Sequence, residues 1–222
     1  MGNYYTEKLS SQKLFQVYAS EIPRIRQYLR AEIEFVKGRL DGSQRVLELG
    51  AGYGRIVREI APHCRSIVGI DISEESVALG REYVKEQPNA EMLVMDVHKM
   101  DFSEPFDAIL CLQNGLSAMG ADLSVVGKVY DALAPGGAAY FSTYSAGFWD
   151  FRLKWFEEQA AKKLLGELDY DQTKDGVIVC KDGFKAKTHS PEDFEKMGKA
   201  LGCRYEIQEV DGSSLFLILY RE

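Results

Sequence analysis

Three regularly spaced glycines stand in the run Glu48-Leu-Gly50-Ala-Gly52-Tyr-Gly54-Arg55. The run follows a short apolar segment and precedes an amphipathic one, which predicts a turn from a strand into a helix. Glycine lets the backbone approach a ligand closely, and the first N–H groups of a helix are free to meet polar atoms. A nucleotide-like ligand suits this turn. A tight turn alone also favours glycine, so the motif needs support from its surroundings.

Carboxylates follow the next two predicted strands. Asp71 ends the second strand, about 20 residues beyond the first glycine, where an acidic side chain can accept hydrogen bonds from ribose hydroxyls. Asp96 and Val97 follow the third strand, where a carboxylate can accept a hydrogen bond from an adenine amino group. Either aspartate alone is also explained as a cap of a strand end. Three such signals after consecutive strands predict one ligand site at the carboxyl edge of a sheet.

The pattern of apolar residues predicts the elements that bring these groups together. Short apolar runs separated by amphipathic stretches are typical of parallel strands joined by helical crossovers. We predict strands at 46–49, 66–70, 92–95, 106–112 and 138–143, and crossover helices at 55–61, 74–86 and 122–133. The sequence therefore predicts an α/β sheet that is covered on both faces.

Two further segments flank this pattern. Apolar residues at three- and four-residue spacing predict a helical cap over residues 6–40, with Pro23 tolerated in a first turn. After the fifth strand, an aromatic helix-like stretch at 148–168 precedes a hairpin that turns at Asp182-Gly183. The second segment is an insertion on the sheet pattern.

The last part of the chain predicts a helix and two strands. Ser190 and Pro191 are typical of a helix start, and Gly202 of its end. Strands at 204–210 and 215–220 follow. We predict a single domain with a cap at 1–43, a core at 44–145, an insertion at 146–189 and a closing unit at 190–222.

Four segments together resemble the class I S-adenosylmethionine-dependent methyltransferases, which have a Rossmann-like fold. They are ELGAGYGR at 48–55, GID at 69–71, MDV at 95–97 and ALAPGG at 132–137. The resemblance covers residues 44–143 and fits the closing helix and strands. It implies a seven-stranded, mostly parallel, doubly wound sheet with an antiparallel last strand, to which this chain adds its helical cap and small hairpin.

The resemblance also implies a site for S-adenosylmethionine. In that family the glycine turn and the end of the fourth strand face the methionine part of the cofactor. The acid after the second strand holds the ribose, and the residues after the third strand recognise adenine. By motif, the predicted cofactor-binding residues are Glu48, Gly50, Ala51, Gly52, Gly54, Asp71, Ile72, Asp96, Val97, Leu112 and Gln113. S-adenosylhomocysteine would be the product.

Methyl transfer from a sulfonium is an in-line displacement, so alignment and exclusion of water supply much of the acceleration. If the acceptor needs deprotonation, the candidate bases are His189 and Tyr144, for which a surface role and a packing role are the alternatives. Tyr4, Tyr5 and Tyr18 are predicted to form a lid over the transferable methyl group. The alternative is a permanent packing helix.

Composition favours a small-molecule acceptor. The 34 acidic residues outnumber the 27 basic ones, and a net charge of −7 opposes binding to nucleic acid. No apolar run approaches the 18 residues of a membrane helix, so we expect no membrane segment. Four scattered cysteines predict reduced thiols in a cytoplasmic protein and no metal site. The sequence leaves a homodimer open.

Two other functions use some of the same residues. An NAD-dependent oxidoreductase would need the glycine turn and Asp71, but its fingerprint is GxGxxG, whereas the spacing here is GxGxG. A non-catalytic S-adenosylmethionine-binding regulatory or partner protein would need no base. Turnover of an acceptor excludes that second alternative.

Overall fold

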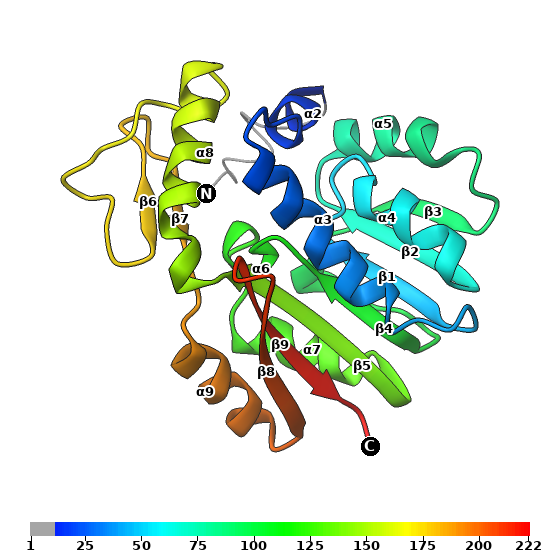
Figure 1. The fold of residues 1–222 in the computed structure, drawn as a ribbon. Helices are drawn as coiled ribbons and strands as arrows, with labels where there is room; N and C mark the ends of the chain where they lie inside the picture. The colour runs from blue at the N-terminus through cyan, green and yellow to red at the C-terminus, as the bar shows by residue number, and fades with distance from the viewer. Residues whose placement is uncertain (1–11) are drawn as a thin grey trace.

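A seven-stranded sheet forms the centre of the computed structural model, which describes residues 12–222 (Figure 1). The strand order is β3-β2-β1-β4-β5-β9-β8. Strands β1 to β5 are parallel, and β9 is antiparallel to both β5 and β8. The strands are β1 (Arg45–Leu49), β2 (Ser66–Asp71), β3 (Ala90–Val94), β4 (Phe106–Cys111), β5 (Leu133–Tyr144), β8 (Arg204–Val210) and β9 (Ser214–Tyr220). The predicted fold class is confirmed.

Helices cover both faces of this sheet because successive side chains of a strand point to opposite sides. On β1, Val46 joins an apolar cluster with α3, α4 and α5, whereas Leu47 joins a second cluster with α6, α7 and α9. Among residues 12–222, no helix is both long and apolar enough to cross a membrane. The helices are α3 (Pro23–Lys37), α4 (Arg55–Ile60), α5 (Glu74–Val84), α6 (Gly115–Ala118), α7 (Leu123–Asp131) and α9 (Pro191–Leu201).

A third apolar cluster lies beyond the carboxyl end of β5. It contains side chains of α2 (Gln12–Tyr18), the first half of α3, α8 (Trp149–Ala161) and the hairpin of β6 (Val177–Val179) and β7 (Lys185–Lys187). Figure 1 shows α8 and the hairpin standing together at one end of the sheet. The predicted hairpin insertion is confirmed.

The N-terminal cap is broken rather than continuous, which corrects the prediction of one helix over 6–40. Helix α2 ends at Tyr18, and α3 begins at Pro23. Proline lacks an N–H group and disfavours helical backbone in the residue before it, and Ile22 is accordingly extended, with φ −74° and ψ 114°. The chain therefore turns a corner at residues 19–22. Residues 6–11 of the predicted helix lie outside the described part of the chain.

The fully buried Arg152 joins α8 to the hairpin. Its guanidinium donates to the carbonyl oxygens of Gly176, at 2.9 Å, and Ala186, at 3.0 Å, and to the hydroxyl of Thr188, at 2.5 Å. The same guanidinium lies 4.4 Å from the ring centre of Tyr144 at the end of β5. One side chain thus satisfies backbone acceptors of the insertion and positions it against the sheet.

We expect Arg152→Ala to lower the free energy of unfolding by about 3 kcal/mol or more, because it removes a fully buried side chain together with its hydrogen bonds to Gly176, Ala186 and Thr188. Arg152→Lys should recover only part of this loss, since an ammonium lacks the planar fork of donors. Urea denaturation measures both effects. Lys154→Ala, an exposed change on the same helix, is the control, and equal stability of Arg152→Ala and the control would contradict this role.

Candidate functional site

A cavity of about 350 Å³ opens where β1, β2 and β4 end, which is the edge at which open α/β sheets bind ligands. Its volume lies within the usual range for small-molecule sites. The sheet side consists of the turns that follow these strands. The opposite side comes from α2, α8 and the loop that leads into β7. The cavity is therefore bounded jointly by the core and by the two added segments.

The glycine turn forms one side of the cavity. Gly50 and Gly52 have φ angles of +67° and +54°, a conformation that favours glycine. The N–H of Gly52 donates to Oδ2 of Asp71 at 2.8 Å, and the N–H of Ser73 donates to Oδ1 at 2.9 Å. Burial raises the pKa of Asp71 against these two hydrogen bonds. Asp71 thus positions the turn, and its carboxylate oxygens keep lone pairs for further donors.

The polar end of the cavity beyond β3 contains Asp96, Val97 and His98. Oδ1 of Asp96 accepts from the backbone N–H of His98 at 2.9 Å and lies 3.0 Å from Nδ1 of the same residue. The backbone hydrogen bond holds the pKa of Asp96 below its ordinary value. Asp96 is thus ionised at neutral pH and offers Oδ2 to a donor.

Three polar side chains in the cavity wall have buried atoms without a hydrogen-bond partner among the described residues. They are Glu48 through Oε2, Arg55 through Nε and Nη2, and Gln113 through Nε2. Glu48 is only 3% exposed, and burial raises its pKa to about 8 although Arg55 opposes the shift. Buried polar groups are normally paired, so one carboxyl oxygen and three donor nitrogens left unpaired in one cavity indicate a ligand with both kinds of group.

The turn that presents Gln113 depends on the buried carboxylate of Glu32 in α3. Oε2 of Glu32 accepts from the N–H of Gln113 at 2.9 Å, and Oε1 accepts from the hydroxyl of Ser214 at 2.7 Å. Gln113 has a left-handed φ of 55°, which a residue with a Cβ rarely adopts. Burial raises the pKa of Glu32 to about 7, against the hydrogen bonds that it accepts. The cap therefore stabilises the loop after β4.

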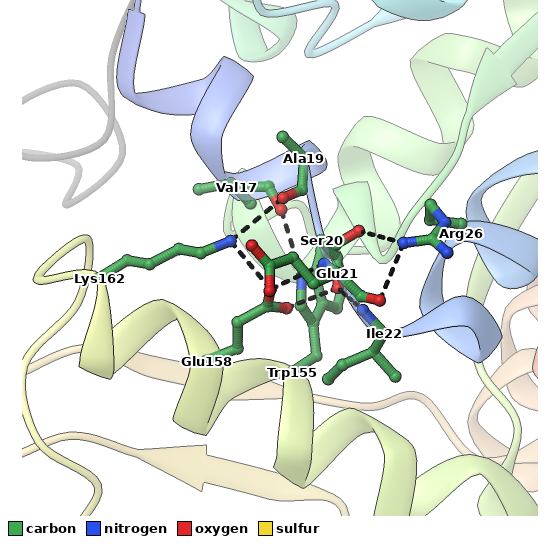
Figure 2. Close-up of polar contacts among 9 residues, drawn as sticks. All are labelled: Val17, Ala19, Ser20, Glu21, Ile22, Arg26, Trp155, Glu158 and Lys162. Atoms are coloured by element: carbon green, nitrogen blue, oxygen red, sulfur yellow. Dashed lines mark hydrogen bonds and ion pairs between the residues drawn. The ribbon is translucent and has the colours of Figure 1, made fainter.

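The cavity is covered by α2 and α8, which are joined at the corner between α2 and α3 (Figure 2). The carboxylate of Glu158 accepts from the hydroxyl of Ser20 at 2.5 Å and from the N–H of Glu21 at 2.9 Å. The indole N–H of Trp155 donates to the carbonyl oxygen of Val17 at 3.2 Å. Burial alone would raise the pKa of Glu158, but the hydrogen bonds that its carboxylate accepts, including those from Ser20 and Glu21, hold the pKa below its ordinary value. We call this set the α2–α8 contact.

The structure brings most of the predicted site residues to the cavity wall. These are Tyr18, Glu48, Gly50, Ala51, Gly52, Asp71, Ile72, Asp96, Val97, Leu112, Gln113 and Tyr144. Gly54 lies outside the wall. A Cβ at Gly54 would lie 3.1 Å from Cγ1 of Val84 and 3.2 Å from Sδ of Met92, so this glycine allows close packing of the turn on α5 and β3. Tyr4 and Tyr5 lie outside the described residues.

Neither candidate base combines a place in the cavity wall with a form that accepts a proton at neutral pH. His189 is not part of the cavity wall, because its ring stacks on Phe194 with centroids 5.6 Å apart. Burial lowers the pKa of His189, so its imidazole is neutral at neutral pH, but its position keeps it from the cavity. Tyr144 does line the cavity, but burial holds its pKa far above its ordinary value, so its hydroxyl stays protonated at neutral pH.

Several wall residues were missed by the sequence prediction. Arg55 stands in the glycine motif itself, yet only its packing against the Tyr18 ring, 4.7 Å away, directs it to the cavity. Other missed residues come from segments without a local motif, and they include Leu14, Val17, Met119, Gln159 and Phe184. A sequence pattern gave no signal for them because they approach the site through tertiary packing.

We expect Glu158→Ala to loosen the cover of the cavity, because it removes the acceptor for Ser20 and Glu21. Hydrogen exchange should become faster at residues 17–22 while β1 and β4 keep their protection. Glu157→Ala is the matched control, since Glu157 accepts from the hydroxyl of Tyr170 instead. Unchanged exchange at residues 17–22 in Glu158→Ala would contradict this account.

Comparison with known proteins agrees with this geometry. Residues 46–137 match the model of a family described as a methyltransferase domain. The ubiquinone biosynthesis O-methyltransferase of Vibrio vulnificus (strain YJ016) is 20% identical over 190 residues, which cover 78% of this chain and 80% of that protein. Nodulation protein S of Sinorhizobium fredii is 27% identical over 99 residues, which cover 44% of this chain and 46% of that protein.

Two solved structures show the same fold. The DhpI–SAM–HEP complex is 18% identical and has a TM-score of 0.65, with 97% of this chain and 94% of that chain covered. N-methyltransferase NodS from Bradyrhizobium japonicum WM9 with S-adenosyl-L-homocysteine is 17% identical and has a TM-score of 0.58, with 99% of both chains covered. Residues 46–137 therefore match a methyltransferase domain, and the chain shares the fold of these two solved structures.

Proposed function

We propose that this chain transfers the methyl group of S-adenosylmethionine to a small-molecule acceptor, and that the cavity at the strand ends binds both. The observation that carries the proposal is the set of unpaired buried groups of Glu48, Arg55 and Gln113 in the same cavity as Asp71 and Asp96. A nucleoside joined to an amino acid has complementary groups for both sets. An ordinary apolar ligand would leave the first set unpaired at a cost of about 1–3 kcal/mol for each group.

We assign a role to each part of the wall by its place in the strand order. Asp96 and Val97 after β3 face adenine, and Asp71 after β2 accepts from the ribose hydroxyls. Beyond the glycine turn, the carboxylate of Glu48 accepts from the α-ammonium group, and Arg55 donates to the α-carboxylate. Such charge-assisted hydrogen bonds are stronger than neutral ones. This assignment gives a partner to each of these charged groups.

S-adenosylmethionine supplies a methyl group that is activated by its sulfonium. A lone pair of the acceptor forms the new bond to the methyl carbon, while the electron pair of the carbon–sulfur bond stays on sulfur and yields S-adenosylhomocysteine. The chain contributes alignment and a covered cavity. Because His189 lies outside the cavity wall and Tyr144 stays protonated, the acceptor loses its proton to water in this proposal.

The acceptor class follows from the size of the cavity and from the charge of the chain. A cavity of about 350 Å³ covered by two helices suits a small molecule. The net charge of −7 disfavours a nucleic-acid acceptor.

Four cysteines without disulfides support a cytoplasmic location. A homodimer stays a prediction.

Calorimetry with S-adenosylhomocysteine and transfer of labelled methyl groups to a panel of acceptors test this proposal. Absence of binding at millimolar concentration would exclude the cofactor. Binding without turnover of any amine, thiol, phenol or carboxylate would favour a non-catalytic binding protein.

We expect Asp71→Ala to weaken cofactor binding by about 1.5–3 kcal/mol for each ribose hydrogen bond lost. Because Asp71 also accepts from Gly52, part of the loss should arise from a less ordered glycine turn. Binding calorimetry together with urea denaturation separates affinity from stability, with the exposed Asp101→Ala as the control. Wild-type affinity in Asp71→Ala would remove this residue from the site.

We expect cofactor affinity to rise with pH between about 6 and 8 because of Glu48. Its pKa of about 8 means that the free protein holds a proton there, and a bound ammonium group favours the carboxylate, so binding releases that proton. Affinity should therefore increase by up to about tenfold per pH unit. Calorimetry in buffers of different ionisation enthalpy measures the released proton. Glu48→Gln should bind more weakly and lose this pH dependence, and an equal slope in both proteins would contradict the role.

A further inference from the structure

Four aromatic side chains of the cavity wall come from the end of β5 and from the insertion that follows it. They are Tyr144 at the end of β5, Trp155 and Phe156 of α8, and Phe184 before β7. All four are at most 6% exposed. We call this part of the wall the aromatic compartment. It belongs to the insertion and the end of β5, whereas the groups assigned to the cofactor belong to the turns after β1 to β4.

The rings of the aromatic compartment present faces and edges at angles to one another. The ring centroids of Phe156 and Phe184 are 5.7 Å apart with planes at 39°, and those of Trp155 and Phe156 are 6.1 Å apart with planes at 67°. Aromatic rings favour such offset and tilted arrangements, so a further flat ring can enter the set with the same contacts.

The charged groups of the cavity wall lie elsewhere. Among the described wall residues, the basic side chains Arg55 and His98 and the acids Glu48, Asp71 and Asp96 lie at or just beyond the carboxyl ends of β1, β2 and β3. The polar edge of Trp155 already donates to Val17. Gln159 and the protonated hydroxyl of Tyr144 are neutral. Arg152 is not part of the cavity wall, and both of its terminal nitrogens already donate to Gly176, Ala186 and Thr188. An anionic acceptor would therefore lose its hydration here without a hydrogen-bonded counter-charge, which is costly.

A cationic acceptor is disfavoured for a different reason. The guanidinium of Arg152 lies 4.4 Å from the ring centre of Tyr144 and 5.6 Å from that of Phe156. The π systems of these two rings therefore already interact with a buried positive charge. A second cation in the compartment would be repelled by it.

We infer that the methyl acceptor is an uncharged small molecule that places a planar aromatic ring in the aromatic compartment. The inference rests on the proposed function. A hydroxyl, thiol or amino group on that ring forms the bond to the methyl carbon, the carbon–sulfur pair remains on sulfur, and the proton of the acceptor passes to water. The ring is held by Trp155, Phe156 and Phe184, with Gln159 as a neutral polar contact at the same wall.

Ligand pairs that differ in one property test this inference on the complex with S-adenosylhomocysteine. Catechol is compared with cyclohexane-1,2-diol, which has the same polar groups without the aromatic ring, and with 3,4-dihydroxybenzoate, which adds a negative charge. We expect catechol to bind at least about fivefold more tightly than either. Equal or tighter binding of the saturated diol or of the anion would overturn the inference.

Variants of the aromatic compartment test whether the preference for catechol arises there. Phe184→Leu and the separate variant Phe156→Met should lose the preference for catechol and keep the affinity for S-adenosylhomocysteine within about twofold. The control is Phe151→Leu on the exposed face of α8, which should keep the preference. A preference that survives in both wall variants would contradict the assignment. Failure of S-adenosylhomocysteine to bind the wild-type protein would instead contradict the proposed function.

Discussion

The buried carboxylate of Glu32 joins three parts of the chain that are distant in sequence. It accepts from Gln113, 81 residues away, and from Ser214, 182 residues away. Gln113 and Asn114 both have left-handed backbone, with φ angles of 55° and 61°, a conformation that persists only where surrounding bonds hold it. Glu32 supplies one of these bonds from the N-terminal cap. The loop that faces the cavity after β4 therefore depends on a helix outside the core.

The same turn is also bonded to the hairpin insertion. The amide of Asn114 donates to the carbonyl oxygen of Lys187 at 3.0 Å and accepts from the hydroxyl of Thr143 at 2.8 Å. Together with Arg152 in α8, these bonds fix the insertion relative to β5. The cap and the insertion thus meet at the turn after β4. This explains why a single cavity can be bounded by the cap, the insertion and the sheet together.

The buried glutamates Glu32 and Glu48 have different roles because their hydrogen-bond partners differ. Both oxygens of Glu32 accept from protein groups, so its hydrogen-bonding capacity is used within the fold. Oε2 of Glu48 has no partner among the described residues, although Arg55 lies close enough to oppose the rise of its pKa. Burial without a partner costs free energy that a bound cation can offset. The first carboxylate supports the turn, and the second is available to a ligand.

The sequence by itself determined the elements whose signals are local. The strand-to-helix turn at Gly50–Gly54, the carboxylates at Asp71 and Asp96, and the capped helix that begins after Ser190 all follow from local signals, and a parallel sheet covered on both faces follows from alternating strands and helices. Only the tertiary structure decided which of these side chains point into the cavity. Packing removed His189 from the cavity, directed Arg55 into it and brought Phe184 from the insertion to α8. These contacts join residues that share no local pattern, because burial and hydrogen-bond satisfaction are properties of the assembled layers rather than of any one segment.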